Sequence, residues 1–367
     1  MYSAGETDTI LDVGGLLVGQ AEDSEALTGI TVLLAPAGAV AGGDLRGGGS
    51  GIRELNLLDP RTTTEQVHAV TLSGGSAFGL DAAGGVMAWL EEQGIGFDVG
   101  VTKVPLVPQA VLFDLAVGSS RIRPDAAMAR EACRRASARG EDLAQGNFGA
   151  GCGATVGKLR GGRGAMKSGI GSASLRLANG FTVGALVAVN ALGDIYEDGR
   201  IIAGLLEPDS GGFADSVRCL LELAGGGGSV GFSGPADGSG ADGGGDGSGA
   251  DGAGNGSDSN AGAVAGDGAF VGQNTTIGII ACNGKFSKAQ CGKIAAMGHN
   301  GMARAIRPVH TTADGDMLFA LATGAMPASV DAAGEMAAIT VERAIIKAIK
   351  AAAPAGGLPA WQNLRRG

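Results

Sequence analysis

Between Gly225 and Gly268 the chain consists almost entirely of Gly, Asp, Ser, Ala and Asn. A segment of this composition cannot bury enough apolar surface to offset the conformational entropy that folding removes. The part that follows, residues 275–367, is expected to hold too few strands to close a core alone. We therefore predict one domain over residues 1–367, interrupted by a disordered linker over residues 225–269.

Composition and charge exclude several classes of protein. The hydrophobic content of 44% is ample for a globular core, and the formal charge of -10 argues against a basic groove for nucleic acid. Six of the acidic residues lie in the linker, so the folded part is closer to neutral. They are Asp237, Asp242, Asp246, Asp251, Asp258 and Asp267.

Membrane insertion and secretion are not expected either. No apolar run approaches the roughly 18–20 residues of a membrane span, and the first residues lack the features of a signal peptide. The five cysteines are scattered and form no CxxC pair. This pattern favours reduced thiols in a cytoplasmic protein over a disulfide framework or a zinc site.

The hydrophobic pattern predicts helices and strands in mixed order. Strands are expected at residues 11–18, 29–34, 69–72, 173–177, 181–189, 276–281 and 317–322. Helices are expected at residues 76–93, 124–140, 218–223, 287–304 and 330–353. Asn179-Gly180 lies between two apolar runs, which is a strong signal for a hairpin. The mixture favours an α+β fold over a parallel doubly wound sheet.

The exit from the linker carries the chemistry of most interest. Gln273-Asn274-Thr275-Thr276 leads directly into an apolar run. A cut between Asn274 and Thr275 would place a hydroxyl and an α-amine on one residue. With an ordinary pKa of about 7.7–8.0, that amine can act as the base for its own hydroxyl. The alternative interpretation is an ordinary linker that feeds an ordinary strand.

Other candidate motifs fail on context. Residues 149–154 fit G-x-G-x-x-A, but no apolar strand precedes them and no acidic residue follows at the required distance. Gly157-Lys158 lacks the rest of a phosphate-binding loop. Ser76 lacks the final Gly of a nucleophile elbow and is expected to cap a helix. His68 is expected in the core.

The segment from His310 to Asp316 has two interpretations. Two carboxylates, Asp314 and Asp316, flank Gly315, as in many ordinary turns. The glycine also lets both side chains converge on one point, which suits the positioning of a nucleophile. For a metal site in this segment, His299 is the only other nearby candidate ligand beside His310, which disfavours a structural zinc or calcium site.

Long ordered motifs now point to a family. The chain resembles the self-processing L-aminopeptidase/D-esterase (DmpA-type) family, in particular its Thr-nucleophile branch, which includes the nylon-oligomer endo-hydrolases. The motifs that carry the resemblance lie at residues 46–54, 72–81, 104–108, 146–158, 183–190, 274–276 and 314–316.

This resemblance implies an αββα four-layer sandwich of the DmpA/ornithine acetyltransferase type. It implies self-cleavage into an α chain, 1–274, and a β chain, 275–367. The catalytic residues it implies are Thr275 as nucleophile, Asn190 at the oxyanion, Asp314 and Asp316 as orienting carboxylates, and Lys167 near the site. It implies a small peptide, amide or ester as substrate, and a homotetramer. The sequence itself shows no cofactor-binding motif, so no cofactor is expected.

Two departures from the family pattern stand out. The Gly/Asp-rich insert is longer than the usual linker, and Cys152 stands where Thr is more common. Three alternatives stay open: an acyltransferase of the ornithine acetyltransferase type, a scaffold that never cleaves, and a metal-dependent hydrolase using His310 and Asp314.

Overall fold

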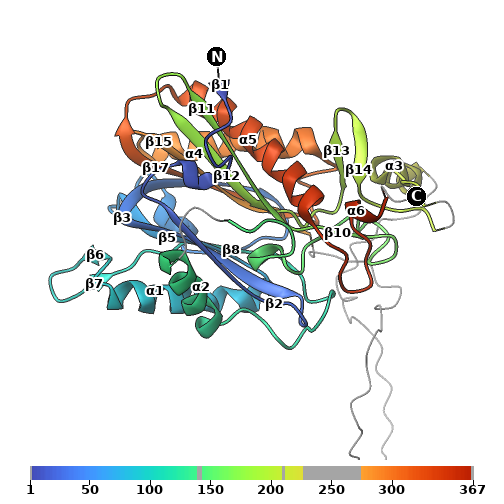
Figure 1. The fold of residues 1–367 in the computed structure, drawn as a ribbon, viewed down its shortest axis with the longest axis horizontal. Coiled ribbons are helices and arrows are strands. Elements are labelled where there is room, and N and C mark those ends of the chain that lie inside the picture. The colour runs from blue at the N-terminus through green and yellow to red at the C-terminus, as the bar shows by residue number, and fades with distance from the viewer. Residues whose placement is uncertain (1, 139–142, 209–210, 226–273, 365–367) are drawn as a thin grey trace, which may run out of the picture.

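The computed structural model describes residues 2–138, 143–208, 211–225 and 274–364. These residues form four layers, two of helices outside and two of strands between them (Figure 1). Three apolar clusters fill the spaces between successive layers. The predicted α+β, αββα sandwich is confirmed.

Ten strands of the described residues form one continuous sheet. Its path runs β1-β11-β12-β15-β17-β3-β5-β8-β4, with β2 paired to β3. The bounds are β1 (Tyr2–Ser3), β2 (Leu17–Asp23), β3 (Thr28–Gly47), β4 (Gly51–Arg53), β5 (Gln66–Ser73), β8 (Gln109–Val111), β11 (Ile170–Leu177), β12 (Thr182–Ala188), β15 (Ile277–Gly284) and β17 (Gly315–Met326).

Strand β3 belongs to both strand layers. Its N-terminal half pairs with β2 and β5, whereas its C-terminal half, Val40 to Gly47, pairs with β17. Its pairing with β5 shifts register between Leu34 and Ala39, which marks the irregularity between the two halves. The sequence predicted a strand only over residues 29–34, because the Gly- and Ala-rich second half lacks the usual apolar alternation.

The helices cover the two outer faces. Helices α4 (Lys288–Ala305) and α5 (Val330–Ala351) pack on β11, β12, β17 and the second half of β3. Helices α1 (Ala83–Glu92) and α2 (Ala126–Ala138) pack on β2, β3 and β5 at the opposite side (Figure 1). These four confirm predicted helices, and α3 (Ser216–Gly225) confirms a fifth.

The segment after the linker lies in the middle of the sheet. Strand β15 pairs antiparallel with β12 and parallel with β17. The hairpin of β11 and β12 that supports it forms as predicted, with Gly180 at a φ of 88° in the turn. The predicted linker, 225–269, lies outside the described residues except for Gly225.

Small elements complete the fold. The remaining short strands are β6 (Phe97–Asp98), β7 (Lys103–Val104), β9 (Thr155–Val156), β10 (Met166–Lys167), β13 (Asp194–Glu197), β14 (Arg200–Ala203) and β16 (Ile306–Arg307). The short helices are η1 (Ile10–Asp12), η2 (Leu55–Leu58), η3 (Ser76–Ala82), η4 (Gly149–Gly151) and α6 (Trp361–Leu364).

Two local predictions were wrong. Residues 11–18 do not form a strand: Thr9 caps the 3-10 helix η1, and β2 begins only at Leu17. Ser76 does not cap its helix, because it lies inside η3 with a φ of 53°, after Gly75 at the N-cap. In both places local hydrogen bonding and turn geometry prevail over the apolar pattern.

No helix among the described residues is long and apolar enough to cross a membrane. All five cysteines are buried and unpaired.

Candidate functional site

The junction nominated from the sequence lies in the interior, at the entrance to β15. Asn274 and Thr276 are fully buried, and Thr275 is 3% exposed. The N–H of Thr275 donates to the main-chain carbonyl of Asn190 at 2.9 Å. Asn274 also forms an isolated parallel bridge with Asp314. The chain therefore enters the sheet between two of the segments that the sequence had marked.

The peptide carbonyl between Asn274 and Thr275 receives two hydrogen bonds. The hydroxyl of Thr275 donates to the Asn274 oxygen at 2.6 Å, and the N–H of Gly315 donates to it at 2.9 Å. Neither polar atom of the buried Asn274 carboxamide has a described partner. Burying such groups without hydrogen bonds costs about 1–3 kcal/mol each.

Asn190 stands two residues beyond the end of β12, where β12 pairs with the start of β15. Its Oδ1 accepts from Lys158 Nζ at 2.7 Å and from Thr155 N at 3.1 Å. Its Nδ2 donates to the carbonyl of Phe113 at 3.0 Å. The structure therefore brings Asn190 to Thr275 through its main chain, and its side chain is held by residues of two other segments, Thr155 with Lys158 and Phe113.

The two aspartates border the same junction. Oδ1 of Asp316 accepts from the N–H of Thr276 at 2.7 Å, and its Oδ2 lies 2.7 Å from His310 Nδ1. Asp314 accepts from the N–H and the hydroxyl of Thr311 at 2.8 and 2.7 Å. Burial, and next the neighbouring Asp316, raise the pKa of Asp314 to about 6.

Lys158 is the residue that sequence reasoning missed. Its Nζ donates to both the Oδ1 and the main-chain oxygen of Asn190, at 2.7 and 3.0 Å. That main-chain oxygen also accepts from Thr275 N, so the lysine and the junction share an acceptor. Burial lowers the pKa of Lys158 to about 7, although nearby carboxylates, Asp314 foremost, act in the opposite direction.

A sequence signal for Lys158 existed. The residue ends the glycine-rich motif at 146–158 that supports the family resemblance, but Gly157-Lys158 was considered only as part of a phosphate-binding loop. The same glycines permit close packing instead: a Cβ on Gly157 would meet the main chain of Gly204 at 2.1 Å.

Lys167, nominated from the sequence, has different contacts. Its Nζ donates to the main-chain carbonyls of Ala154 and Ser168 at 2.8 and 2.7 Å, and to that of Gly151 at 3.3 Å. Burial lowers its pKa to about 7. None of its described hydrogen bonds reaches Thr275 or Asn190, so it holds the glycine-rich segment in shape.

The histidines of this region pack on each other. The rings of His299 and His310 lie edge to face, 4.8 Å apart, and burial lowers the pKa of His299 to about 4. Among the described residues, no group of three or more His, Cys, Asp or Glu side chains could hold a metal ion. The metal-site interpretation of His310 and Asp314 thus gains no support from the side-chain arrangement.

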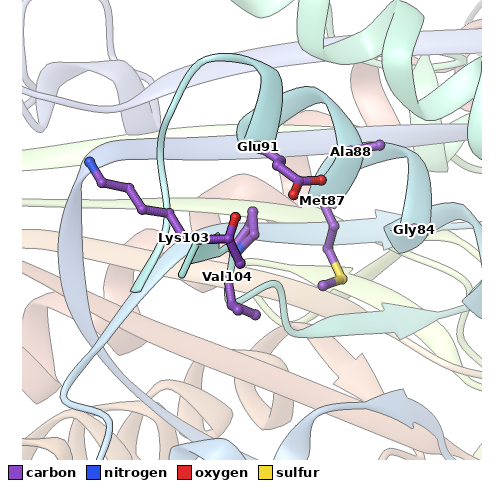
Figure 2. A pocket seen from close by; sticks show the side chains of 8 residues that line it. Gly84, Met87, Ala88, Glu91, Lys103 and Val104 are labelled. Carbon is purple, nitrogen blue, oxygen red and sulfur yellow. The ribbon is translucent and has the colours of Figure 1, made fainter. Parts of the chain in front are cut away.

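A separate hollow of about 360 Å³ lies between α1 and β7 (Figure 2). Its walls are mainly apolar, with Glu91 and Lys103 as the charged groups. The Lys103 amine donates to the Gly94 carbonyl. None of the candidate catalytic residues lines this hollow, so it is not where the reaction would occur.

Comparisons with known proteins identify the family of this chain. The model of a family described as peptidase family S58 matches residues 8–360. A Mycobacterium tuberculosis protein described as an uncharacterised aminopeptidase is 38% identical over 389 residues, which is 97% of this chain and 98% of that protein. A 6-aminohexanoate-oligomer endohydrolase of a Kocuria species is 30% identical over 88% of this chain and 76% of its own length.

Two solved structures share the fold. An L-aminopeptidase/D-Ala-esterase/amidase from Ochrobactrum anthropi, a variant among the Ntn hydrolase folds, gives a TM-score of 0.68 at 17% identity and covers 99% of this chain and 94% of its own. A β-aminopeptidase from a Burkholderia species gives 0.64 at 19% identity, covering 100% and 94%. At these identities the likeness shows the fold alone.

Proposed function

The chain belongs to peptidase family S58 and is a hydrolase of peptide or amide bonds; from this premise we propose that it matures by cutting its own Asn274–Thr275 bond. Thr275 then serves as an N-terminal nucleophile. The observation that carries the proposal is the 2.6 Å approach of the Thr275 hydroxyl to the Asn274 carbonyl inside a closed, buried site.

Self-cleavage proceeds in two steps. Thr275 Oγ attacks the carbonyl carbon of Asn274, the C–N bond breaks, and the nitrogen of Thr275 takes up the proton that the hydroxyl gave up. This first step frees the α-amine of Thr275 and leaves Asn274 as an ester on Oγ. Water then hydrolyses that ester, which frees the Thr275 hydroxyl and leaves a carboxylate on Asn274. The leaving nitrogen already donates to the carbonyl of Asn190, which holds it in place.

A base is needed before any free α-amine exists. Lys158 fits this role because its buried amine is neutral above a pH of about 7 and shares the Asn190 carbonyl with Thr275 N. A base whose pKa lies near the working pH is the most effective general base. In the mature enzyme the α-amine of Thr275 takes over the proton transfer.

The remaining residues position these groups. Asp316 fixes the N–H of Thr276, and Asp314 lies beside Asn274 in the adjoining segment. We assign Asn190 as an oxyanion donor because the family resemblance implies this role. The hydrogen bonds of Lys167 favour a structural role for it.

The substrates we propose are small amides and peptides with a free amino terminus, and linear amide oligomers of the kind named for the Kocuria relative. We further propose a homo-oligomer in the cytoplasm, in keeping with five unpaired thiols.

A paired assay tests the proposal. Wild-type protein and Thr275→Ala are incubated with p-nitroanilides of L-, D- and β-amino acids and with linear 6-aminohexanoate oligomers. Turnover by the wild type alone is expected. The control is Thr312→Ala, which removes an exposed threonine in the loop before Asp314 and should keep full activity. Equal turnover by Thr275→Ala would contradict the proposal.

The acyltransferase alternative is tested in the same samples. Transfer of the acetyl group from N-acetylornithine to glutamate, faster than release to water, would replace hydrolysis as the reaction.

A further inference from the structure

A main-chain N–H already donates a hydrogen bond to the carbonyl that would react. Gly315 N–H lies 2.9 Å from the Asn274 oxygen, within the range at which donors stabilise a developing oxyanion. The second hydrogen bond to that oxygen comes from Thr275 Oγ, which must turn from the oxygen to the carbon in order to attack. Gly315 is therefore the contact that persists as negative charge develops.

The fold fixes this N–H in direction. Gly315 opens β17 and pairs with Gly47 of β3, and the neighbouring carbonyl of Asp314 accepts from Gly49 N at 2.9 Å. A Cβ at position 315 would lie 2.3 Å from the Gly49 oxygen, so only glycine lets the 47–50 segment close over the strand. Donors held rigidly in this way pay no reorganisation cost during the reaction.

The described hydrogen bonds of the Asn190 side chain go to other groups. Its Nδ2 donates to the Phe113 carbonyl, and its Oδ1 accepts from Lys158 and Thr155. None of these bonds reaches the Asn274 oxygen, whose two described donors are Thr275 Oγ and Gly315 N.

We propose that the main-chain N–H of Gly315 is an oxyanion donor at Thr275. It acts first on the Asn274 carbonyl during self-cleavage. Once Asn274 has left, it acts on the substrate carbonyl, which must take the same position to be attacked by the same oxygen. This inference rests on the proposed self-processing mechanism and adds to it the group that stabilises charge.

In each reaction the charge forms and collapses on one oxygen. Attack by Thr275 Oγ turns the carbonyl carbon tetrahedral and places the negative charge on the oxygen that faces Gly315 N. When the C–N bond breaks, the carbonyl re-forms and the nitrogen leaves with the proton. The N–H of Gly315 donates throughout and is not consumed.

The test removes the N–H and little else. Glycolic acid is incorporated in place of Gly315 by nonsense suppression, which replaces the amide by an ester. The rate of precursor cleavage is then followed on denaturing gels after synthesis of the full chain. We expect cleavage to slow by about 10²–10³-fold, as for the loss of one oxyanion donor elsewhere.

Two ester controls separate this effect from general damage. An ester at Met317 removes the N–H that donates to the Thr276 carbonyl at 3.1 Å, two residues further along β17. An ester at Gly49 removes the N–H that donates to the Asp314 carbonyl. The ester at 315 weakens this same hydrogen bond, because it turns the Asp314 carbonyl into an ester carbonyl, so the Gly49 ester measures how much that side effect contributes. The Met317 ester should cleave within a few-fold of the wild type, and the Gly49 ester should slow cleavage less than the Gly315 ester does.

The possible outcomes are distinct. A Gly315 ester that cleaves as fast as the controls overturns the inference and leaves self-processing intact. A wild-type chain that stays whole contradicts the proposed function, and the inference falls with it.

A second measurement serves if the Gly315 ester does not fold. Mature protein labelled with ¹⁵N-glycine and ¹³C-carbonyl aspartate reports only Asp-Gly amides. The probe is the aldehyde of the amino acid whose p-nitroanilide is hydrolysed fastest. Its adduct with Thr275 should move the Gly315 amide proton downfield. An unchanged Gly315 resonance in the presence of the adduct contradicts the inference.

Discussion

At the residue scale, two buried lysines with similar pKa values have different partners. Lys158 donates to Asn190 beside the junction, whereas Lys167 donates to three main-chain carbonyls. We therefore expect replacement by Met to slow self-cleavage at position 158 and to lower stability at position 167.

Lys158→Met should leave a folded precursor whose self-cleavage is slowed by at least about 10²-fold, the lower range for a lost general base. Lys167→Met should lower the free energy of unfolding by about 2–4 kcal/mol, because buried carbonyls lose their donor. Denaturing gels measure the first effect and urea unfolding the second. A Lys158→Met chain that cleaves at the wild-type rate would exclude this lysine as the base.

The pH dependence of self-cleavage follows from the same residue. The pKa of Lys158 is lowered to about 7, so the amine carries its proton below that pH and is neutral above it. The cleavage rate of the precursor should therefore rise as pH increases through about 7 and then level off. Turnover by the mature enzyme should follow the α-amine instead, with an ordinary pKa of about 7.7–8.0. Purified precursor, obtained from a slowed variant such as the Gly315 ester, allows the two profiles to be compared.

Sequence reasoning nominated side chains for the candidate site but none of its main-chain groups. Thr275, Asn190, Asp314 and Asp316 were nominated from motifs, and the structure brings all four segments to one junction. Whether Lys158 or Lys167 lies beside the junction depends on which of the two segments turns toward Asn190. The spacing of residues in the sequence does not reveal this. The N–H of Gly315 belongs to the backbone, so the residue type does not indicate its role.

At the scale of elements, most strands and helices follow from hydrophobic periodicity. The predictions failed where a side-chain cap or the backbone conformation determines the structure, and the length of one strand was underestimated where small residues form it. Strand β3 extends over twenty residues, Thr28–Gly47, because small residues let α4 approach it. A Cβ on Gly42 would meet the main-chain nitrogen of Gly292 in α4 at 2.2 Å. Hydrophobic periodicity does not reveal this close approach of α4, because glycine has no side chain that contributes to the pattern.

Two adjacent glycines in α1 give a matched test of this packing. A Cβ on Gly85 would lie 2.2 Å from the Ala126 oxygen, whereas one on Gly84 would meet nothing within 4 Å. Gly85→Ala should cost about 1–3 kcal/mol of stability by overpacking. Gly84→Ala should add about 0.5–1 kcal/mol through helix propensity. Thermal unfolding of the two variants measures both, and equal melting temperatures would contradict the described contact of α1 with α2.

At the scale of the whole molecule, the two predicted chains share one sheet. Strand β15, which would begin the β chain, lies between β12 of the α chain and β17. Helices α4 and α5 then cover strands from both chains. The interface between the chains is thus the core of the fold itself.

We therefore predict that cleavage does not separate the chains. They should elute together in native gel filtration and part only in denaturant, with no loss of secondary structure by circular dichroism. Dissociation in native buffer would contradict a single domain over residues 1–367.

The intact mass of the purified protein under denaturing conditions, with N-terminal sequencing of any smaller chain, tests self-processing most directly. The predicted result is two chains, the smaller beginning Thr-Thr-Ile-Gly, with Thr275→Ala remaining whole. A single wild-type chain of 35.8 kDa, or a smaller chain beginning at any other residue, would contradict the account.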